Sequence, residues 1–122
     1  MSTRSIRLYD IAHARSGDKG SGANVGVIAY TSAGYAFLRD ALTAERVEAF
    51  FKPLGVGKVT RYELPNLEAF NFLLPQILAG GGSRSLRVDA QGKTLGQALL
   101  ELPLDIPVDL LDACLRPMET VS

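Results

Sequence analysis

Residues 5–30, SIRLYDIAHARSGDKGSGANVGVIAY, carry the strongest indication of the fold. Ser5–Ala14 alternates buried-type and polar residues, which predicts a strand with one buried face. Val25–Tyr30 reads VGVIAY and predicts a short buried strand. Arg15–Asn24 lies between them and has no large apolar residue, so we expect a loop. Two consecutive strands joined in this way form an antiparallel hairpin with an unusually long connection.

The segments that follow the hairpin predict helices and a third strand. Thr31 and Ser32 can cap a first helix, and Thr43 can cap a second over Ala44–Phe51. Lys58–Leu64 reads KVTRYEL and predicts a strand from its alternation and its β-branched and aromatic content.

The second half of the chain mixes short elements. A helix is expected to start at Asn66 and to stop at the proline nine residues later. Thr94–Leu102 predicts another helix, Leu104–Ile106 an edge strand, and Val108–Leu115 a last short helix. The order predicts an α+β fold in which helices pack on one face of an antiparallel sheet. We expect a single domain over residues 1–122, with a globular part of about 5–115.

Composition argues against several functional classes. Lysine plus arginine equals aspartate plus glutamate, 13 each, whereas a nucleic-acid binder usually has a basic excess. No stretch approaches the ~20 apolar residues that span a bilayer, and the N-terminus lacks the apolar core of a signal peptide. We therefore expect a cytoplasmic protein without nucleic-acid or membrane contacts. The single cysteine, Cys114, is expected to be buried, and with the single histidine far away no metal site is predicted.

Acidic residues gather at the C-terminal end. Residues 101–122 contain Arg116 as their only basic residue and five acidic residues. We interpret this as a solvated tail. The alternative is a tail that docks on a basic groove of a partner or of a second copy.

Arg15–Asn24 is the first candidate site. Consecutive glycine-rich amides can cradle an anion, and Arg15 and Lys19 add positive charge. The segment is not a phosphate-binding P-loop, because no GK[ST] sequence occurs. The alternative is an exposed loop rich in turn-forming residues.

Gly80–Lys93, GGGSRSLRVDAQGK, is the second candidate site. Arg84, Arg87 and Lys93 offer positive groups, and a helix starting near Lys93 would present its N-terminal amides to an anion. The alternative is that Asp89 caps that helix and the glycines form a hinge.

Catalytic residues stay unidentified from the sequence, and the candidates are three. His13 lies at the mouth of the first loop, where it can act as a general base, or it can be a packed structural residue. Asp18 and Asp89 can pair if the two loops meet.

Three strings together resemble a known family: ARSGDKGSGANVGVIAY (14–30), YELPNLEAFNF (62–72) and GGGSRSLRVDAQGKTLGQALL (80–100). They resemble the AtuA-like ferredoxin-fold domain over roughly Ile6 to Leu102. That domain occurs at the C-terminus of acyclic terpene utilisation AtuA proteins and as a short separate chain beside a larger partner.

The resemblance implies a ferredoxin-like two-layer α+β sandwich and a small accessory subunit of an AtuA-type large chain, in a homo- or hetero-oligomer. The pathway implied degrades terpenoid acids as acyl-CoA thioesters, so a CoA ester is the expected ligand and no other cofactor is expected. A single cysteine excludes a cysteine-ligated iron–sulfur cluster. The anion-binding candidates are Arg15, Ser16, Gly17, Lys19, Asn24, Arg87, Gln91 and Lys93.

Two alternatives remain open. One is a stand-alone acyl-CoA hydratase or isomerase that uses Asp18, His13 or Asp89 as acid and base. The other is a structural homo-oligomer without catalysis, in which the two loops form subunit contacts. The residues themselves do not identify a reaction.

Overall fold

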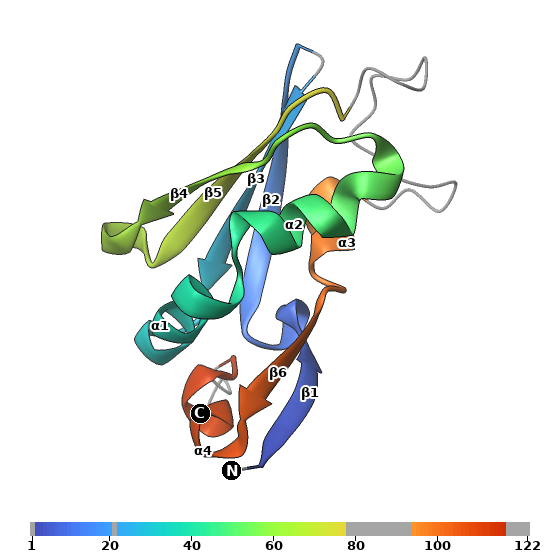
Figure 1. The fold of residues 1–122 in the computed structure, drawn as a ribbon. Helices are drawn as coiled ribbons and strands as arrows, with labels where there is room; N and C mark the ends of the chain where they lie inside the picture. The colour runs from blue at the N-terminus through green and yellow to red at the C-terminus, as the bar shows by residue number, and fades with distance from the viewer. Residues whose placement is uncertain (1, 21, 78–93, 117–122) are drawn as a thin grey trace.

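The computed structural model describes residues 2–20, 22–77 and 94–116 (Figure 1). The elements of these ranges, in chain order, are β1 (Thr3–Arg7), β2 (Ala12–Lys19), β3 (Gly22–Ala29), α1 (Ser32–Ala41), α2 (Ala44–Phe51), β4 (Thr60–Leu64), β5 (Ala69–Leu74), α3 (Leu95–Leu99), β6 (Pro103–Pro107) and α4 (Val108–Cys114). Short 3-10 turns cover Leu8–Asp10, Lys52–Leu54 and Pro65–Leu67.

Four antiparallel strands form the main sheet, in the order β2-β3-β5-β4. The chain runs from the β2–β3 hairpin through α1 and α2 to the β4–β5 hairpin, and α1, α2 and α3 all lie on one side of the sheet (Figure 1). The predicted α+β class, with an antiparallel sheet and helices on one face, is confirmed. β6 does not join this sheet; it pairs with β1 in a separate two-stranded sheet.

The expected loop over Arg15–Asn24 is wrong. Strands β2 and β3 pair along their full length, from Ala12 opposite Ala29 to Lys19 opposite Gly22. β2 therefore stays extended up to Lys19, and Gly20 after it has a φ of +62°, which glycine adopts without strain. The glycine-rich segment is thus the far end of a hairpin. It lacks the large apolar residues whose alternation would have indicated a strand, so the sequence pattern predicts a loop instead.

The expected helix after Asn66 is also wrong. Ala69–Leu74 is β5, a central strand whose alternating residues Phe70, Phe72 and Leu74 are buried. The four-residue spacing of Phe70 and Leu74 fits one face of a helix as well as one face of a strand. Because Phe72 between them is also buried, the burial repeats every two residues, as in a strand. The preceding 3-10 turn ends in Glu68, which has a left-handed φ of 51°.

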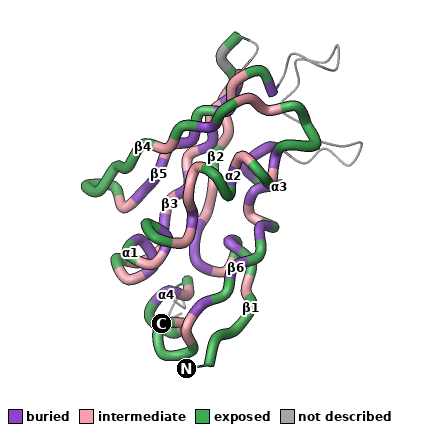
Figure 2. The backbone as a smooth tube through the Cα atoms, in the orientation of Figure 1, coloured by how far each residue is buried: buried purple, intermediate pink, exposed green. Residues whose placement is uncertain are grey.

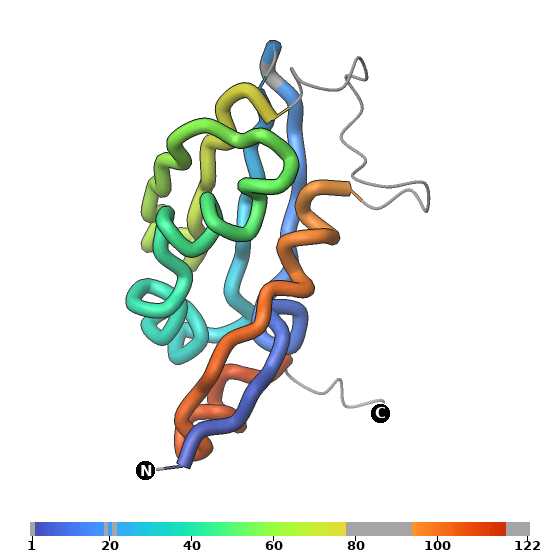
Figure 3. The backbone as a smooth tube through the Cα atoms, turned by 45° about the vertical axis from the view of Figure 1, so that its right-hand side comes forward, coloured from blue at the N-terminus to red at the C-terminus, as the bar shows by residue number. Residues whose placement is uncertain are grey.

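The expected first strand, Ser5–Ala14, divides into β1 and the start of β2. A 3-10 turn over Leu8–Asp10 separates them, and β1 pairs with β6 from Thr3 opposite Pro107 to Arg7 opposite Pro103. In Figure 3 the β1–β6 ladder extends from the end of the main sheet. The edge strand predicted over Leu104–Ile106 is confirmed as part of β6.

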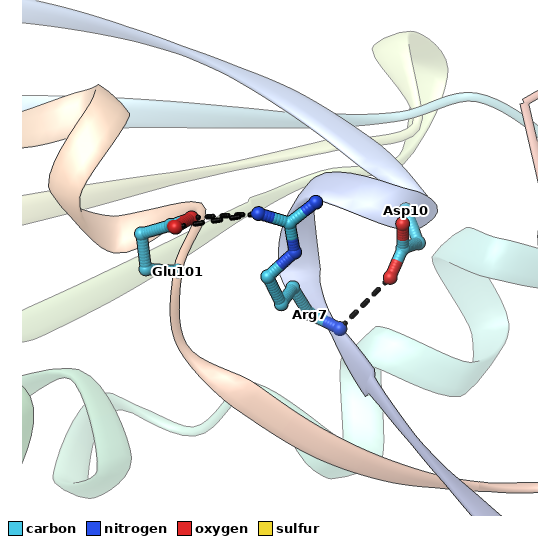
Figure 4. A network of polar contacts seen from close by, with 3 residues as sticks. All are labelled: Arg7, Asp10 and Glu101. Carbon is cyan, nitrogen blue, oxygen red and sulfur yellow. Dashed lines mark hydrogen bonds and ion pairs between the residues drawn. The ribbon is translucent and has the colours of Figure 1, made fainter.

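Arg7 fastens the junction between the two sheets (Figure 4). Its amide donates to Asp10 Oδ2 at 2.9 Å, and its guanidinium lies 3.1 Å from Glu101 Oε2. Both charged side chains are about half exposed, so the ion pair contributes at most about 1 kcal/mol. The backbone adds more continuous support, because Leu8 N donates to Leu102 O.

Helices α1 and α2 start where the sequence predicts. Thr31 Oγ1 accepts from Gly34 N at 2.9 Å, and Thr43 Oγ1 accepts from Arg46 N at 3.1 Å, so both threonines are N-caps. α4 lies within the predicted 108–115 range, and Cys114 is fully buried at its end, as expected. Burial raises the pKa of the Cys114 thiol above its usual value.

The core lies between the sheet and the three helices, and Figure 2 shows buried and partly buried residues alternating along β3. The sheet contributes Val25, Val27, Phe70 and Phe72, and the helices contribute the apolar residues Tyr35, Leu38, Val47, Phe51, Leu95 and Leu99. Arg61 also lies on this side: its Nη1 donates to the carbonyls of Arg39 and Leu42, and its guanidinium covers the Phe70 ring.

Candidate functional site

The open face of the main sheet is the side opposite α1, α2 and α3. Directly paired residues of neighbouring antiparallel strands present their side chains on the same face. The pairing therefore places the following positions on the open face: His13, Arg15, Gly17, Gly22, Asn24, Gly26, Ile28, Thr60, Tyr62, Leu64, Ala69, Asn71 and Leu73. None of these positions carries a carboxylate, so no side chain among them is negatively charged at neutral pH.

Large apolar side chains are exposed on the β4–β5 half of this face. Tyr62 is 50% exposed, Leu64 39% and Leu73 38%, and Leu67 in the adjoining turn is 67% exposed. A hollow of about 600 Å³ lies beside Tyr62, Leu64 and Leu67. Its lining consists of Asn24, Gly26, Ile28, Tyr62, Leu64, Leu67, Ala69, Phe70 and Asn71. A sheet face that meets solvent is usually polar, so a group of exposed apolar side chains on this face is unusual.

Two asparagines form a polar pair in the middle of the open face. Asn24 Nδ2 donates to Asn71 Oδ1 at 3.2 Å across the β3–β5 boundary. Gly17 lies opposite Asn24, and a Cβ on Gly17 would come within 2.7 Å of Asn24 Oδ1. Glycine at 17 therefore leaves the space that the Asn24 amide occupies, and the pair has a fixed place on the sheet.

One row of paired residues crosses all four strands. Arg15 pairs with Gly26, Gly26 with Asn71, and Asn71 with Tyr62. The row thus carries a guanidinium, a gap without a side chain, an amide and a phenol. Neighbouring strands are about 4.8 Å apart, so the row extends over roughly 14 Å. Three hydrogen-bond donors around a gap suit an occupant with an oxygen anion or a carbonyl.

Ser16 and Asp18 lie on the opposite, helix-covered side of β2. Ser16 Oγ accepts a hydrogen bond from Gly96 N, which ties the hairpin to α3. A Cβ on Gly96 would come within 2.8 Å of that hydroxyl, so the close contact requires glycine. The structure therefore divides the predicted residues of the hairpin: Arg15, Gly17 and Asn24 share the open face, whereas Ser16 has a structural partner.

His13 is on the open face, at the end of β2 far from the hairpin tip. Its ring stacks on Tyr30 with centroids 5.5 Å apart, and the Arg116 guanidinium lies 5.7 Å from the same Tyr30 ring. Asp18 is five residues further along β2 and on the other face, which separates the two by about 16 Å. His13 and Asp18 cannot act on one reacting atom together.

Backbone amides at the start of α3 have hydrogen-bond partners within the chain. Thr94 caps the helix: its hydroxyl accepts from Gln97 N at 3.1 Å, and the Gln97 side chain accepts from Thr94 N at 2.9 Å. Gly96 N is bound by Ser16. The first amides of this five-residue helix are thus largely used by the chain itself, and the cap is Thr94 rather than Asp89.

The other candidates lie outside the described residues. These are Arg87, Asp89, Gln91 and Lys93. Lys19 is described only as part of the β2 backbone. In the described part of the chain, no three His, Cys, Asp or Glu side chains come together as a metal site would require. The same ranges contain no helix with the length and apolar character needed to cross a membrane.

Residues 6–105 match the AtuA ferredoxin-like domain family. The chain belongs to this family. The match covers the hairpin, both helices of the crossover and the β4–β5 pair, so the open face lies entirely within the AtuA ferredoxin-like domain. No curated protein and no solved structure gives a significant match.

The sequence does not predict that Gly26 and Asn71 belong to the open face of this AtuA ferredoxin-like domain. Gly26 falls in the predicted buried strand, and Asn71 falls in the predicted helix. The signal was present in the sequence: Gly22, Asn24 and Gly26 alternate with Ala23, Val25 and Val27. Over Gly22–Gly26 the second face of β3 carries only glycine and asparagine, which leaves that part of the face open for another molecule.

A second hollow, of about 590 Å³, lies over α1 and α4. It is lined by Ala33, Ala36, Phe37, Asp40, Ala41 and Leu110. Its single charged group is the carboxylate of Asp40, and it lacks the row of donors that distinguishes the open face. We therefore regard the open face as the candidate functional site.

Proposed function

We propose that this chain is a small accessory subunit of an AtuA-type enzyme of acyl-CoA or terpenoid-acid catabolism, and that it binds the larger AtuA-type chain through its open face. One observation carries the proposal: Tyr62, Leu64 and Leu73 are exposed together on a sheet whose opposite side is already covered by helices. A clustered apolar surface of this kind is typical of a protein–protein contact.

The polar groups of the open face support the same role. Arg15 supplies a cation and Asn71 an amide, and no carboxylate stands at the open-face positions to oppose an acidic partner. Such one-sided charge favours orientation and selection of a partner. In the assembled complex this contact would complete a shared site that handles the CoA ester or its acyl carboxylate.

The positions of the acid–base candidates support a binding role for the small chain. A general acid and a general base for one substrate must both reach it within hydrogen-bond distance. His13 packs on Tyr30 on one face of β2, and Asp18 lies on the other face. A stand-alone hydratase or isomerase that used these two groups would need them on the same side.

Coexpression with the larger AtuA-type chain of the same genome tests the proposal. We expect one complex by size-exclusion chromatography with light scattering. Leu73→Glu should abolish it, because it places a charge in the apolar contact. Leu54→Glu is the matched control: Leu54 is 39% exposed, against 38% for Leu73, but it lies in the turn after α2.

Three outcomes would contradict the proposal. The first is no complex with the wild-type chain under any salt condition tested. The second is equal loss of binding in Leu54→Glu and Leu73→Glu. The third is a stable homodimer of the isolated chain that Leu73→Glu converts to monomer, because two copies would then cover each other's open faces.

A further inference from the structure

Neither the backbone conformation nor the packing within this chain requires a glycine at position 26. It lies in the middle of the central strand β3, where glycine weakens a sheet. Its φ is not left-handed, and a Cβ added there would have a single neighbour, Phe70 O at 4.0 Å.

The other glycines nearby differ in this respect. Gly17 and Gly96 each have a side-chain oxygen within 3 Å of the added Cβ, and Gly20 has a positive φ. These three positions are explained by their own surroundings. Gly26 instead leaves the floor of the hollow open, at a cost in strand stability.

The hollow above Gly26 is lined from one side. Its walls come from a sheet face and one turn, whereas a site for a small ligand usually encloses most of the ligand surface. An occupant would stay largely exposed unless it belonged to a molecule that also covered Tyr62, Leu64 and Leu73. The shape therefore favours an anchor side chain of a protein partner.

The charges around the hollow indicate the character of that anchor. Arg15 is exposed and lies next to Gly26 in the row, with Asn71 on the other side. The apolar residues Ile28, Leu64 and Leu67 line the remainder of the hollow. An apolar side chain of the partner would match the apolar lining, and a neighbouring carboxylate would match Arg15.

We infer that the larger chain inserts one apolar side chain into the hollow above Gly26 and pairs an adjacent Asp or Glu with Arg15. This rests on the proposed function and adds the chemistry of the partner's contact segment. Gly26 is the position that admits the anchor, and Arg15 is the group that orients it.

The test measures affinity for the larger AtuA-type chain together with the thermal stability of each variant. Gly26→Val places a branched side chain on the floor of the hollow, so we expect an unchanged or higher Tm and binding weakened about tenfold or more. Gly26→Ala should weaken binding about threefold and is the second variant if Gly26→Val folds poorly. Arg15→Ala should weaken binding and flatten its salt dependence, whereas Arg4→Ala, an exposed arginine on β1, should change neither.

The outcomes separate this inference from the proposed function. If the wild-type chain forms no complex, the proposed function fails. If it forms the complex but Gly26→Val and Gly26→Ala bind as tightly as wild type, the anchor is overturned and the accessory role stands. Octanoate is titrated as the small-molecule probe: micromolar binding to the isolated chain, lost in Gly26→Val, would replace the protein anchor with an amphiphilic ligand. An unchanged salt dependence in Arg15→Ala would overturn the carboxylate contact.

Discussion

The two faces of the main sheet are built by the same four strands and have opposite character. On the helix-covered face, Val25, Val27, Phe70 and Phe72 fill the space beneath the helices and are fully buried. On the open face the intervening positions are glycine, asparagine, the buried Ala69 and partly exposed apolar residues. The fold depends on the first set, whereas the second set contributes little packing, so its residues are available for binding.

β5 shows the difference within one strand. Phe70 and Leu73 are three residues apart and point to opposite faces. Phe70 is fully buried, stacks on Tyr35 with centroids 4.8 Å apart and carries the Arg61 guanidinium above its ring. Leu73 is 38% exposed. Alternation alone therefore separates a residue that holds the core from one that is free to meet a partner.

Phe70→Ala gives the largest expected effect. Removal of a buried phenylalanine ring costs about 3–5 kcal/mol of the free energy of unfolding, and here it also removes the support of Tyr35 and Arg61. Leu73→Ala on the other face should cost about 1 kcal/mol or less. Urea unfolding followed by circular dichroism measures both. Equal costs would mean that the two faces do not differ as described.

Gly96→Ala tests the contact between β2 and α3 beneath the covered face. The new Cβ would lie 2.8 Å from Ser16 Oγ, so we expect a loss of about 1–3 kcal/mol in spite of the better helix propensity of alanine. The clash disappears when the hydroxyl is removed. In a double-mutant cycle, Gly96→Ala should therefore cost much less in a Ser16→Ala background. Additive effects would contradict the contact.

Two glycines of the open face give opposite expectations. Gly17→Ala must displace the Asn24 amide and break its bond to Asn71, at a cost of about 1 kcal/mol. Gly26→Ala meets open space and should stabilise the isolated chain by about 0.4–1 kcal/mol. Thermal unfolding of the two variants, compared with wild type, is a direct test. A destabilised Gly26→Ala would show that position 26 is glycine for structural reasons.

Tyr35→Phe gives the smallest effect and sharpens the description of the covered face. Within the described part of the chain, the buried Tyr35 hydroxyl has no hydrogen-bond partner. An unsatisfied buried hydroxyl is costly, so its removal should be neutral or stabilising by up to about 1 kcal/mol while the stack on Phe70 is kept. A clear loss of stability would mean that the hydroxyl is paired in solution.

The sequence predicted the elements whose signals are local. The threonine caps of α1 and α2 and the proline-bracketed strand β6 depend on neighbouring residues, and all three were found in place. β5 was missed because its apolar spacing also fits a helix. The far half of the β2–β3 hairpin was missed because glycine and serine are typical of loops, and only pairing with a second strand makes Arg15–Lys19 extended.

The candidate site was less predictable than the fold. The sequence predicts Arg15, Gly17 and Asn24 as part of an anion-binding loop, and the structure places them on one face of the sheet with Asn71 from another hairpin. Ser16 and Asp18 alternate to the other side, which a loop model does not distinguish. Tyr62 and Leu73 lie on the open face because of the register between strands. The register between distant segments cannot be predicted from local sequence.

The pairing of β1 with β6 joins two segments that lie far apart in the sequence. The four strands of the main sheet and the crossover helices are all contained in residues 12–74, so they can assemble early. β1 is synthesised first, yet its partner strand begins at Pro103, nearly a hundred residues later. Contacts between such distant segments form slowly, because a long loop must close first. We therefore expect β1 to pair with β6 late in folding.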